Sequence, residues 1–163
     1  ASVSKELGLP LRFPGRPAAY EGLRDMTDAG LLARAMVWAA TEPRSGNQAF
    51  NINNGDLFRW SEMWPQIGRF FELEVAPPLP MQLETVMADK ASLWKAMAKK
   101  HGLAPHAYAE LSSWRFADFV FSWGYDMFGD GSKARRFGFH EHVDTAAMFT
   151  AIFADLRRRR VIP

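Results

Sequence analysis

Tyrosine, histidine and glycine patterns are the parts of this sequence that could carry chemistry. A tyrosine that takes part in proton transfer can be assisted by a lysine one helical turn later, where both side chains share a face. No tyrosine here has that partner, because the residues four positions after Tyr20, Tyr108 and Tyr125 are Arg24, Ser112 and Gly129. The chain also lacks a Gly-x-Ser-x-Gly turn and a phosphate loop. We therefore predict no catalytic residues in this chain.

A glycine pattern from Gly129 to Ala134 matches the dinucleotide-binding fingerprint with Ala in its last place. That fingerprint binds a pyrophosphate only where a strand leads into the turn and a helix opens at the phosphates. Here an aromatic helix is expected before the turn and a basic loop after it. The pattern therefore indicates a surface turn, and we predict no cofactor-binding residues in this chain.

Metal and thiol chemistry find little support. His140 and His142 offer two ligands, whereas zinc needs three or four, and neither Glu141, Asp144 nor His106 completes a familiar spacing. The chain contains no cysteine, which excludes disulfides, thiolate nucleophiles and cysteine metal sites. The histidines are interpreted as part of a loop before a helix cap, and no metal is expected.

Aromatic residues gather in one segment, between Trp114 and Phe128. Phe116, Phe119 and Trp123 share one face of a helix, because they are spaced by three and four residues. Such a face either packs into the core or forms the wall of a pocket for an apolar small molecule. Periodicity fits both interpretations equally well.

These residues must be positioned by a helix-rich α+β chain with a few short strands, which we expect to form a single unit over residues 1–163. Capping and periodicity predict the end of a helix over 1–8, followed by helices over 28–41, 62–71, 81–101 with a break near Asp89, 114–123 and 144–159. Thr27 or Asp28 is the expected cap of the helix over 28–41, and Gly102 is the expected end of the helix over 81–101. Ser61 is the expected cap of the helix over 62–71, with Pro65 in its first turn. Strands are predicted over 9–13, 48–53 and 73–75, and a loop over 124–138.

Composition and charge narrow the setting of the chain. Hydrophobic residues make up 48% and aromatic residues 13% of the 163 residues, which is enough for a core. No signal peptide or membrane-spanning run is visible, and this together with the absence of cysteine favours the cytoplasm. The net charge is +2, and the run Arg157–Arg160 is interpreted as a helix end that complements the helix dipole. Nucleic-acid binding would need a wider basic face, so neither nucleic acid nor membrane is an expected partner.

Several segments together resemble a known family. They are Gly8–Gly15, Ala18–Glu21, Asp28–Thr41, Asn47–Trp60, Trp114–Phe119, Ser132–Phe139 and Val161–Pro163. In this order they resemble the carboxy-terminal half of the progesterone 5β-reductase and iridoid synthase-like reductases. These enzymes are atypical members of the extended short-chain dehydrogenase/reductase group.

The resemblance implies a division of labour. In the family, an amino-terminal Rossmann domain binds NADPH and supplies the catalytic tyrosine and lysine. This chain corresponds to the substrate-binding portion of an NAD(P)H-dependent reductase acting on an activated C=C bond or carbonyl of a hydrophobic small molecule. On its own it is expected to bind no NADPH and to be inactive. The alternative is a stand-alone binding or interaction domain derived from such a reductase.

The resemblance also assigns substrate-binding positions. Phe116 matches a pocket-wall phenylalanine, while Tyr20, Arg24 and Tyr125 align with other pocket-side positions, and Trp114 completes the set. Arg24 departs from the smaller polar residue expected there. Because a buried guanidinium needs a carboxylate or carbonyl partner, Arg24 favours a polar or acidic substrate over a neutral steroid.

Partners follow from the same resemblance. Without a Rossmann half, the helix at Ala1, the helix at Asp28 and the strand over 48–53 are expected to expose faces that the family covers. Apolar faces and unpaired strand edges of this kind favour association. We therefore expect the chain to self-associate or to pair with the missing half.

Overall fold

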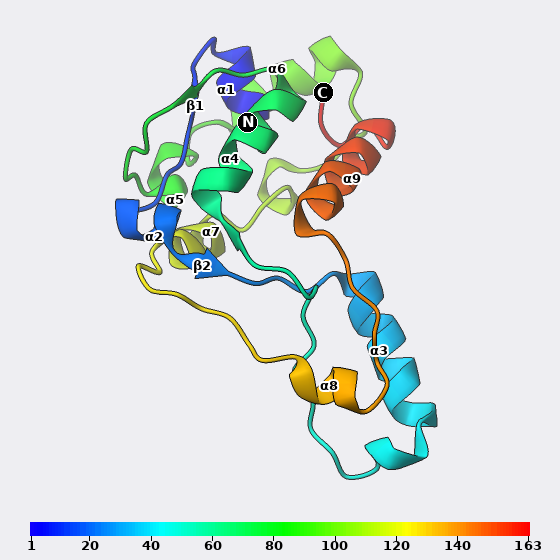
Figure 1. Cartoon of the computed structure of the whole chain (residues 1–163). Coiled ribbons are helices and arrows are strands. Elements are labelled where there is room, and N and C mark those ends of the chain that lie inside the picture. The colour runs from blue at the N-terminus through cyan, green and yellow to red at the C-terminus, as the bar shows by residue number, and fades with distance from the viewer.

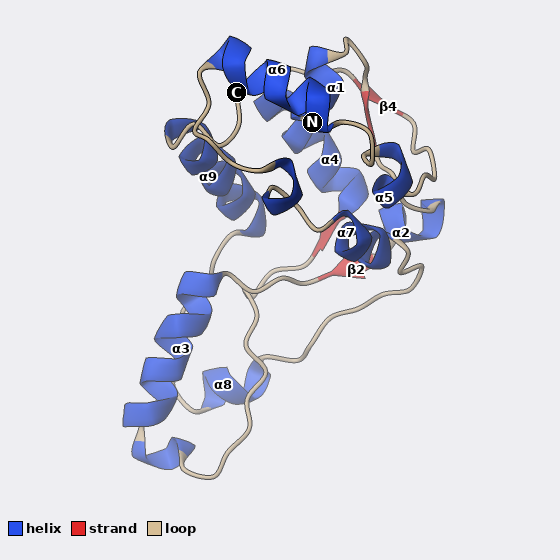
Figure 2. Ribbon diagram, turned by 180° about the vertical axis from the view of Figure 1, so that it is seen from behind, coloured by secondary structure: helices blue, strands red, loops and turns tan.

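The computed structural model describes residues 1–163 and is dominated by helices (Figures 1 and 2). The elements, in order, are α1 Ser2–Glu6, β1 Leu11–Arg12, α2 Pro17–Glu21, β2 Leu23–Arg24, α3 Ala29–Thr41, η1 Pro43–Ser45, β3 Phe58–Arg59, α4 Trp60–Phe71, β4 Val75–Ala76, α5 Leu83–Val86, α6 Ala91–His101, η2 Tyr108–Glu110, α7 Trp114–Phe121, α8 Ser132–Arg136 and α9 Thr145–Arg158. This confirms the predicted helix-rich α+β class. None of the helices combines the length and the apolar character that a membrane crossing requires.

The elements form two parts, which we call the body and the lobe. The lobe contains α3, η1 and α8 and projects from the end of the body, while both chain termini lie in the body (Figure 1). Extended segments connect the two parts (Figure 2).

The core of the body is an aromatic cluster built around α4. Its buried side chains recur every three or four residues and include Trp60, Met63, Trp64, Ile67 and Phe71, which is the pattern of a helix with one apolar face. Phe13 lies against them fully buried, with its ring centroid 5.1 Å from that of Trp64. The body therefore encloses the core that the aromatic content predicts.

The start of α4 differs from the prediction. The helix begins at Trp60, so Ser61 lies inside it, and its hydroxyl donates to a Glu21 carboxylate oxygen at 2.9 Å instead of capping the helix. Pro65 consequently lies in the second turn. The reason is tertiary, because β3 pairs with β2 immediately before the helix and sets the point where the chain turns.

Two of the three predicted strands agree with the structure in position, and one does not. β1 lies within the predicted range 9–13, and β4 overlaps the range 73–75 but extends one residue beyond it; the two pair in parallel. The strand predicted over 48–53 is wrong, because that segment has no strand partner in this chain. The antiparallel pair of β2 and β3 was not predicted, since two residues are too few to show an alternating pattern.

Helix ends follow the predicted signals more closely. The carboxylates of Asp28 and Asp144 accept backbone N–H bonds from Leu31 and Ala147, at 2.8 and 2.7 Å, which is the geometry of an N-cap. Gly102 ends α6 in the left-handed region, with φ of 60°.

The helix predicted over 81–101 is divided into α5 and α6, which confirms the predicted break near Asp89, although Lys90 rather than Asp89 precedes α6. The predicted loop over 124–138 contains the short helix α8. Ala134 of α8 is buried against α3, so a tertiary contact stabilises a helix too short to be visible from periodicity.

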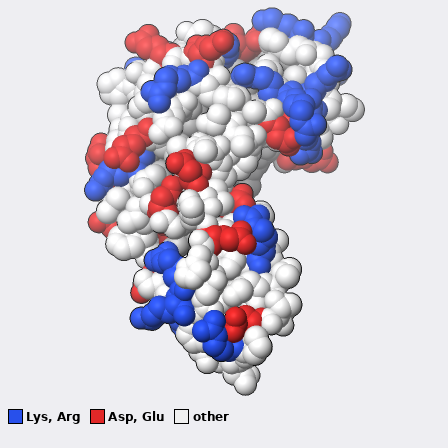
Figure 3. All heavy atoms as spheres, turned by 45° about the vertical axis from the view of Figure 1, so that its right-hand side comes forward, with Lys and Arg blue, Asp and Glu red and all other residues white.

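Helix α3 is apolar on two sides. Its inner residues Leu31 and Ala35 are buried in the lobe. On its outer side Leu32, Met36 and Val37 are exposed, Met36 by 66% and Val37 by 65%. Uncharged side chains cover the right-hand edge of the lobe in Figure 3, whereas charges of both signs are interspersed over the body. A helix with two apolar faces normally packs on both of them, so the outer face of α3 lacks a partner within this chain.

Candidate functional site

The aromatic segment forms an exposed surface on the body, which we call the aromatic wall. It consists of the neighbouring rings of Phe116, Phe119 and Trp123, together with the exposed rings of Tyr125 and Phe128 on the loop that follows α7. Phe116 is 62% exposed, Phe119 57%, Tyr125 59% and Phe128 53%. The Phe119 ring lies 6.4 Å from that of Phe116 and 5.1 Å from that of Trp123. Exposed aromatic side chains in contact with one another mark an interaction site more strongly than scattered ones.

Phe116 and Phe119 lie on the outer side of α7, and the inner side of this helix packs against the body. Phe121 points the other way and packs into the core, with its ring 5.1 Å from Phe13 and 5.9 Å from Trp64. Core packing, one of the two interpretations of the aromatic segment, is thus correct for the inner side of α7, while a ligand-binding role of the outer side stays a prediction. Core packing of Phe121 fixes the helix, and the outer rings remain available.

Helix α5 supports α7 from the side. The carboxylate of Asp118 on α7 accepts the backbone N–H of Leu83 at 2.6 Å and of Glu84 at 2.9 Å. These amides belong to the first turn of α5, where N–H groups have no partner within the helix. The bonds therefore hold α7 against the start of α5.

Arg24 lies beneath the loop that follows α7. Its side chain is buried, with 3% exposed. The guanidinium donates to the carbonyl oxygens of Leu23 (at 2.8 Å), Tyr125 and Trp123. The carbonyl partners that a buried guanidinium requires are thus supplied by the chain itself.

The other residues predicted to bind substrate lie at different distances from the wall. Tyr20 is partly buried, with its ring 5.0 Å from that of Phe13, and burial raises the pKa of its hydroxyl. Trp114 lies at the start of α7 beside Tyr108, at a ring distance of 6.4 Å. The structure therefore exposes both Phe116 and Tyr125 and bonds Arg24 to the Tyr125 backbone. Tyr20 belongs to the core side. Their roles in substrate binding stay predictions.

The glycine pattern from Gly129 to Ala134 leads into α8 rather than into the basic loop that was expected. No strand leads into it, since the preceding residues form the loop after α7. Gly129 instead donates its backbone N–H to the Asp25 carboxylate at 2.8 Å. The segment is thus engaged in contacts within the chain.

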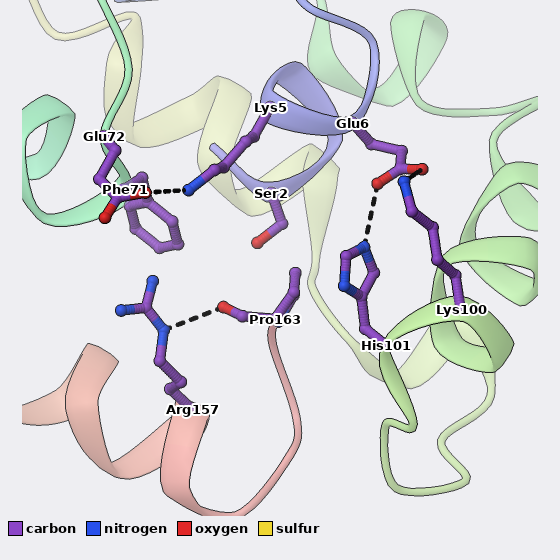
Figure 4. A pocket seen from close by; sticks show the side chains of 9 residues that line it. All are labelled: Ser2, Lys5, Glu6, Phe71, Glu72, Lys100, His101, Arg157 and Pro163. Carbon is purple, nitrogen blue, oxygen red and sulfur yellow. Dashed lines mark hydrogen bonds and ion pairs between the residues drawn. The ribbon is translucent and has the colours of Figure 1, made fainter.

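A second, charged cleft of about 450 Å³ opens where α1, α6 and α9 meet (Figure 4). Its lining comes from distant parts of the sequence: Ser2, Lys5, Glu6, Phe71, Glu72, Lys100, His101, Arg157 and Pro163. No sequence signal points to it, because no two of its elements are adjacent in the chain.

The charges of this cleft are largely paired with one another. Lys100 Nζ and His101 Nε2 lie 2.7 and 3.0 Å from the Glu6 carboxylate, and these contacts hold the pKa of Glu6 below its ordinary value. Lys5 donates to Glu72 at 2.6 Å and likewise lowers the pKa of that carboxyl. The pairs join α1 to α6 and to the end of α4, which supports a structural role for the cleft.

Comparisons with known proteins agree on one family. Residues 5–163 match the model of a family described as the PRISE-like Rossmann-fold domain. The chain is 36% identical over 166 residues to an (S)-8-oxocitronellyl enol synthase of Antirrhinum majus, an alignment that covers 100% of this chain and 43% of that protein. A second (S)-8-oxocitronellyl enol synthase, from Nepeta racemosa, is 34% identical over 142 residues, covering 85% of this chain and 36% of its own length. The chain thus spans less than half the length of these relatives.

Proposed function

Because the chain belongs to the family of PRISE-like Rossmann-fold domains, we propose that it is the substrate-binding portion of an NADPH-dependent reductase. The resemblance to iridoid synthase-like reductases is confirmed by relatives that align with the whole chain. The substrate class we propose is a hydrophobic small molecule with an activated C=C bond or a carbonyl. The observation that carries the proposal is the aromatic wall, whose exposed rings can cover an apolar ligand.

The contribution of this chain is binding and orientation. The only glycine-rich pattern lacks the strand that a pyrophosphate site requires, and its Gly129 is bonded to Asp25. These residues do not fit NADPH, so we assign no step of the reaction to a cofactor held here. We propose that the chain by itself binds no NADPH and turns over no substrate.

We further propose that the outer face of α3 pairs with the remainder of a longer protein. Leu32, Met36 and Val37 form an apolar stripe that nothing in this chain covers. Residues 48–53, of which Phe50 and Ile52 pack against the inner side of α3, have the partly alternating pattern of a strand but no strand partner. Both features fit a helix and strand that complete a sheet contributed by other residues.

This face gives a prediction for the 163-residue chain. In the absence of a partner, sedimentation velocity should show self-association that increases with concentration, since exposed apolar stripes attract one another. Replacing Met36 by Glu should shift the chain to monomer, because a charge would have to be buried at the contact. A wild-type chain that sediments as a monomer at all concentrations would contradict the proposal.

The aromatic wall gives a second prediction. Titration with N-phenyl-1-naphthylamine, a neutral apolar fluorophore, should show saturable binding to the chain. Phe116→Ala should weaken the affinity about tenfold, because part of the area that covers the ligand is lost.

Met36→Ala is the matched control, since Met36 is equally exposed but lies on α3. Its affinity should equal that of the wild type. Equal losses in both variants, or no binding by the wild type, would refute the aromatic wall as a ligand site. Titration of the same chain with NADPH should show no saturable binding, and saturation would overturn the proposed division of labour.

A further inference from the structure

Arg24 is a buried cation without a carboxylate partner. Its side chain is 3% exposed, and its three hydrogen-bond acceptors are the backbone carbonyls of Leu23, Trp123 and Tyr125. The Nε atom is buried without any partner. Burying a charge in this way is costly, so the contacts with the loop after α7 must contribute something that a smaller residue would not.

The guanidinium of Arg24 occupies the space beside the Cα atom of Gly22. A Cβ atom at position 22 would lie 2.8 Å from Nη1 and 3.1 Å from Nη2 of Arg24. The backbone of Gly22, with φ of −65° and ψ of 143°, is one that any residue can adopt. A side chain at this position would therefore displace the guanidinium, whereas the dihedral angles themselves place no restriction on the residue.

The loop that Arg24 binds carries three of the five residues of the aromatic wall. Trp123 and Tyr125, whose carbonyls accept from the guanidinium, are two of its rings, and Phe128 follows three residues later. Arg24 thus reaches the wall through the backbone of the wall residues themselves.

Other bonds continue the same attachment along β2. Asp126 accepts the backbone N–H of Leu23 at 2.8 Å, and Met127 donates its own N–H to the Leu23 carbonyl at 2.9 Å. Further on, Asp25 accepts from Gly129 at 2.8 Å. The loop is therefore held against β2 over its whole length, with the guanidinium at the end nearest α7.

We infer that Arg24 is a positioning residue, which fixes the aromatic wall for an apolar ligand through the carbonyls of Trp123 and Tyr125. This inference rests on the proposed function of the wall. Only arginine offers donors in a planar fork that can reach the carbonyls of two residues of one loop, here Trp123 and Tyr125. With the loop fixed in advance, the rings need not be ordered when the ligand binds, and this preserves affinity.

The test is the affinity of the 163-residue chain for N-phenyl-1-naphthylamine, which is neutral and therefore insensitive to the charge of Arg24. Arg24→Lys keeps the charge but loses the fork, and Gly22→Ala keeps Arg24 but displaces its guanidinium. Each variant should weaken the affinity about tenfold. In the Arg24→Lys background, Gly22→Ala should have no more than a twofold further effect, because the group it displaces is already absent.

Hydrogen exchange provides a readout that does not depend on the ligand. In both single variants the amides of Met127 and Gly129 should exchange faster, while those of α9 keep their wild-type rates. An increase in every element would indicate general loss of stability and would overturn the positioning role. Arg44→Lys is the matched control, because Arg44 also donates to a loop carbonyl, that of Phe137 at 2.8 Å, but lies in the lobe.

The outcomes separate the two proposals. If the wild type binds the fluorophore and both single variants bind it equally well, Arg24 does not position the wall, and the wall remains a ligand site. If the wild type itself does not bind, the proposed function of the wall fails and the inference about Arg24 fails with it. If the effects of Arg24→Lys and Gly22→Ala are fully additive, they act independently and the inference is wrong.

Discussion

Replacing Phe13 by Ala is expected to lower the free energy of unfolding by about 3 to 5 kcal/mol, the range for removing a fully buried aromatic ring. The Phe13 ring is completely buried and lies between Tyr20, Trp64 and Phe121, at 5.0, 5.1 and 5.1 Å. Its removal leaves a cavity that the rigid rings around it cannot fill. Urea denaturation followed by tryptophan fluorescence measures the loss.

The consequence extends to the aromatic wall. Phe121 is the residue of α7 that faces Phe13, so a cavity there loosens the side of the helix that holds the exposed rings. Phe13→Ala should therefore also weaken binding of the neutral fluorophore under conditions where the variant is folded.

Phe116→Ala is the control for stability, since it removes the same ring from an exposed position. It should change the free energy of unfolding by less than about 1 kcal/mol. Similar losses of stability in Phe13→Ala and Phe116→Ala would show that Phe13 is not at the centre of the core.

A second large effect is expected at Asn54, where the body meets the lobe. Asn54 is fully buried. Its side-chain carbonyl accepts the backbone N–H of Asp28 at 2.6 Å, and its Nδ2 donates to the Thr145 hydroxyl at 2.9 Å. That hydroxyl in turn donates to the Asp56 carboxylate at 2.6 Å. One amide thus joins the start of α3 to the start of α9.

Asn54→Asp should lower the free energy of unfolding at pH 7 by about 3 kcal/mol or more, as expected for an uncompensated buried charge. The new oxygen would replace the donor that faces Thr145, and it would add a negative charge beside Asp56. Burial raises the pKa of the introduced carboxyl in the folded chain above its unfolded value of about 4. The loss should therefore be small below pH 4 and should grow as the pH rises.

Asn51→Asp is the matched control from the same segment. Asn51 is exposed, and its amide makes a single bond to the Asp130 carbonyl at 3.3 Å. This variant should lose less than about 1 kcal/mol, with little dependence on pH. Denaturant titrations of both variants at pH 4 and pH 7 decide the matter, and a loss for Asn54→Asp that does not change with pH would contradict the buried charge.

Local signals in the sequence predicted a large part of the fold. Caps at Asp28 and Asp144 and the terminator Gly102 marked helix ends correctly, because capping satisfies backbone groups within a few residues of the signal. The apolar periodicities of α3, α7 and α9 were likewise visible, because spacings of three and four residues place side chains on one side of a helix. The pair of β2 and β3 and the helix α8 were beyond such signals, because neighbouring segments stabilise them.

The strand expected over 48–53 shows the same limit from the other side. The alternating pattern is present, but a strand exists only where another backbone pairs with it. In this chain the side chains of Asn51 and Asn53 bond instead to the loop carbonyls of Asp130 and Gly129.

For the candidate site, the sequence by itself determined which residue types are present and how they are spaced. It indicated an aromatic segment on a helix, a family resemblance that places Phe116 at a pocket-wall position, and an Arg24 whose guanidinium would need an acceptor once buried. Residue type and local spacing carry this information, because they decide helix faces and hydrogen-bonding capacity.

Only the tertiary structure decided which way these side chains point and which groups they contact. It turned Phe121 inward and the other rings outward, and it placed Arg24 beneath carbonyls of residues about a hundred positions later in the chain. It also left the outer face of α3 without a cover. Contacts between such distant segments depend on how the whole chain packs, and no local pattern encodes which backbone groups will meet a given guanidinium.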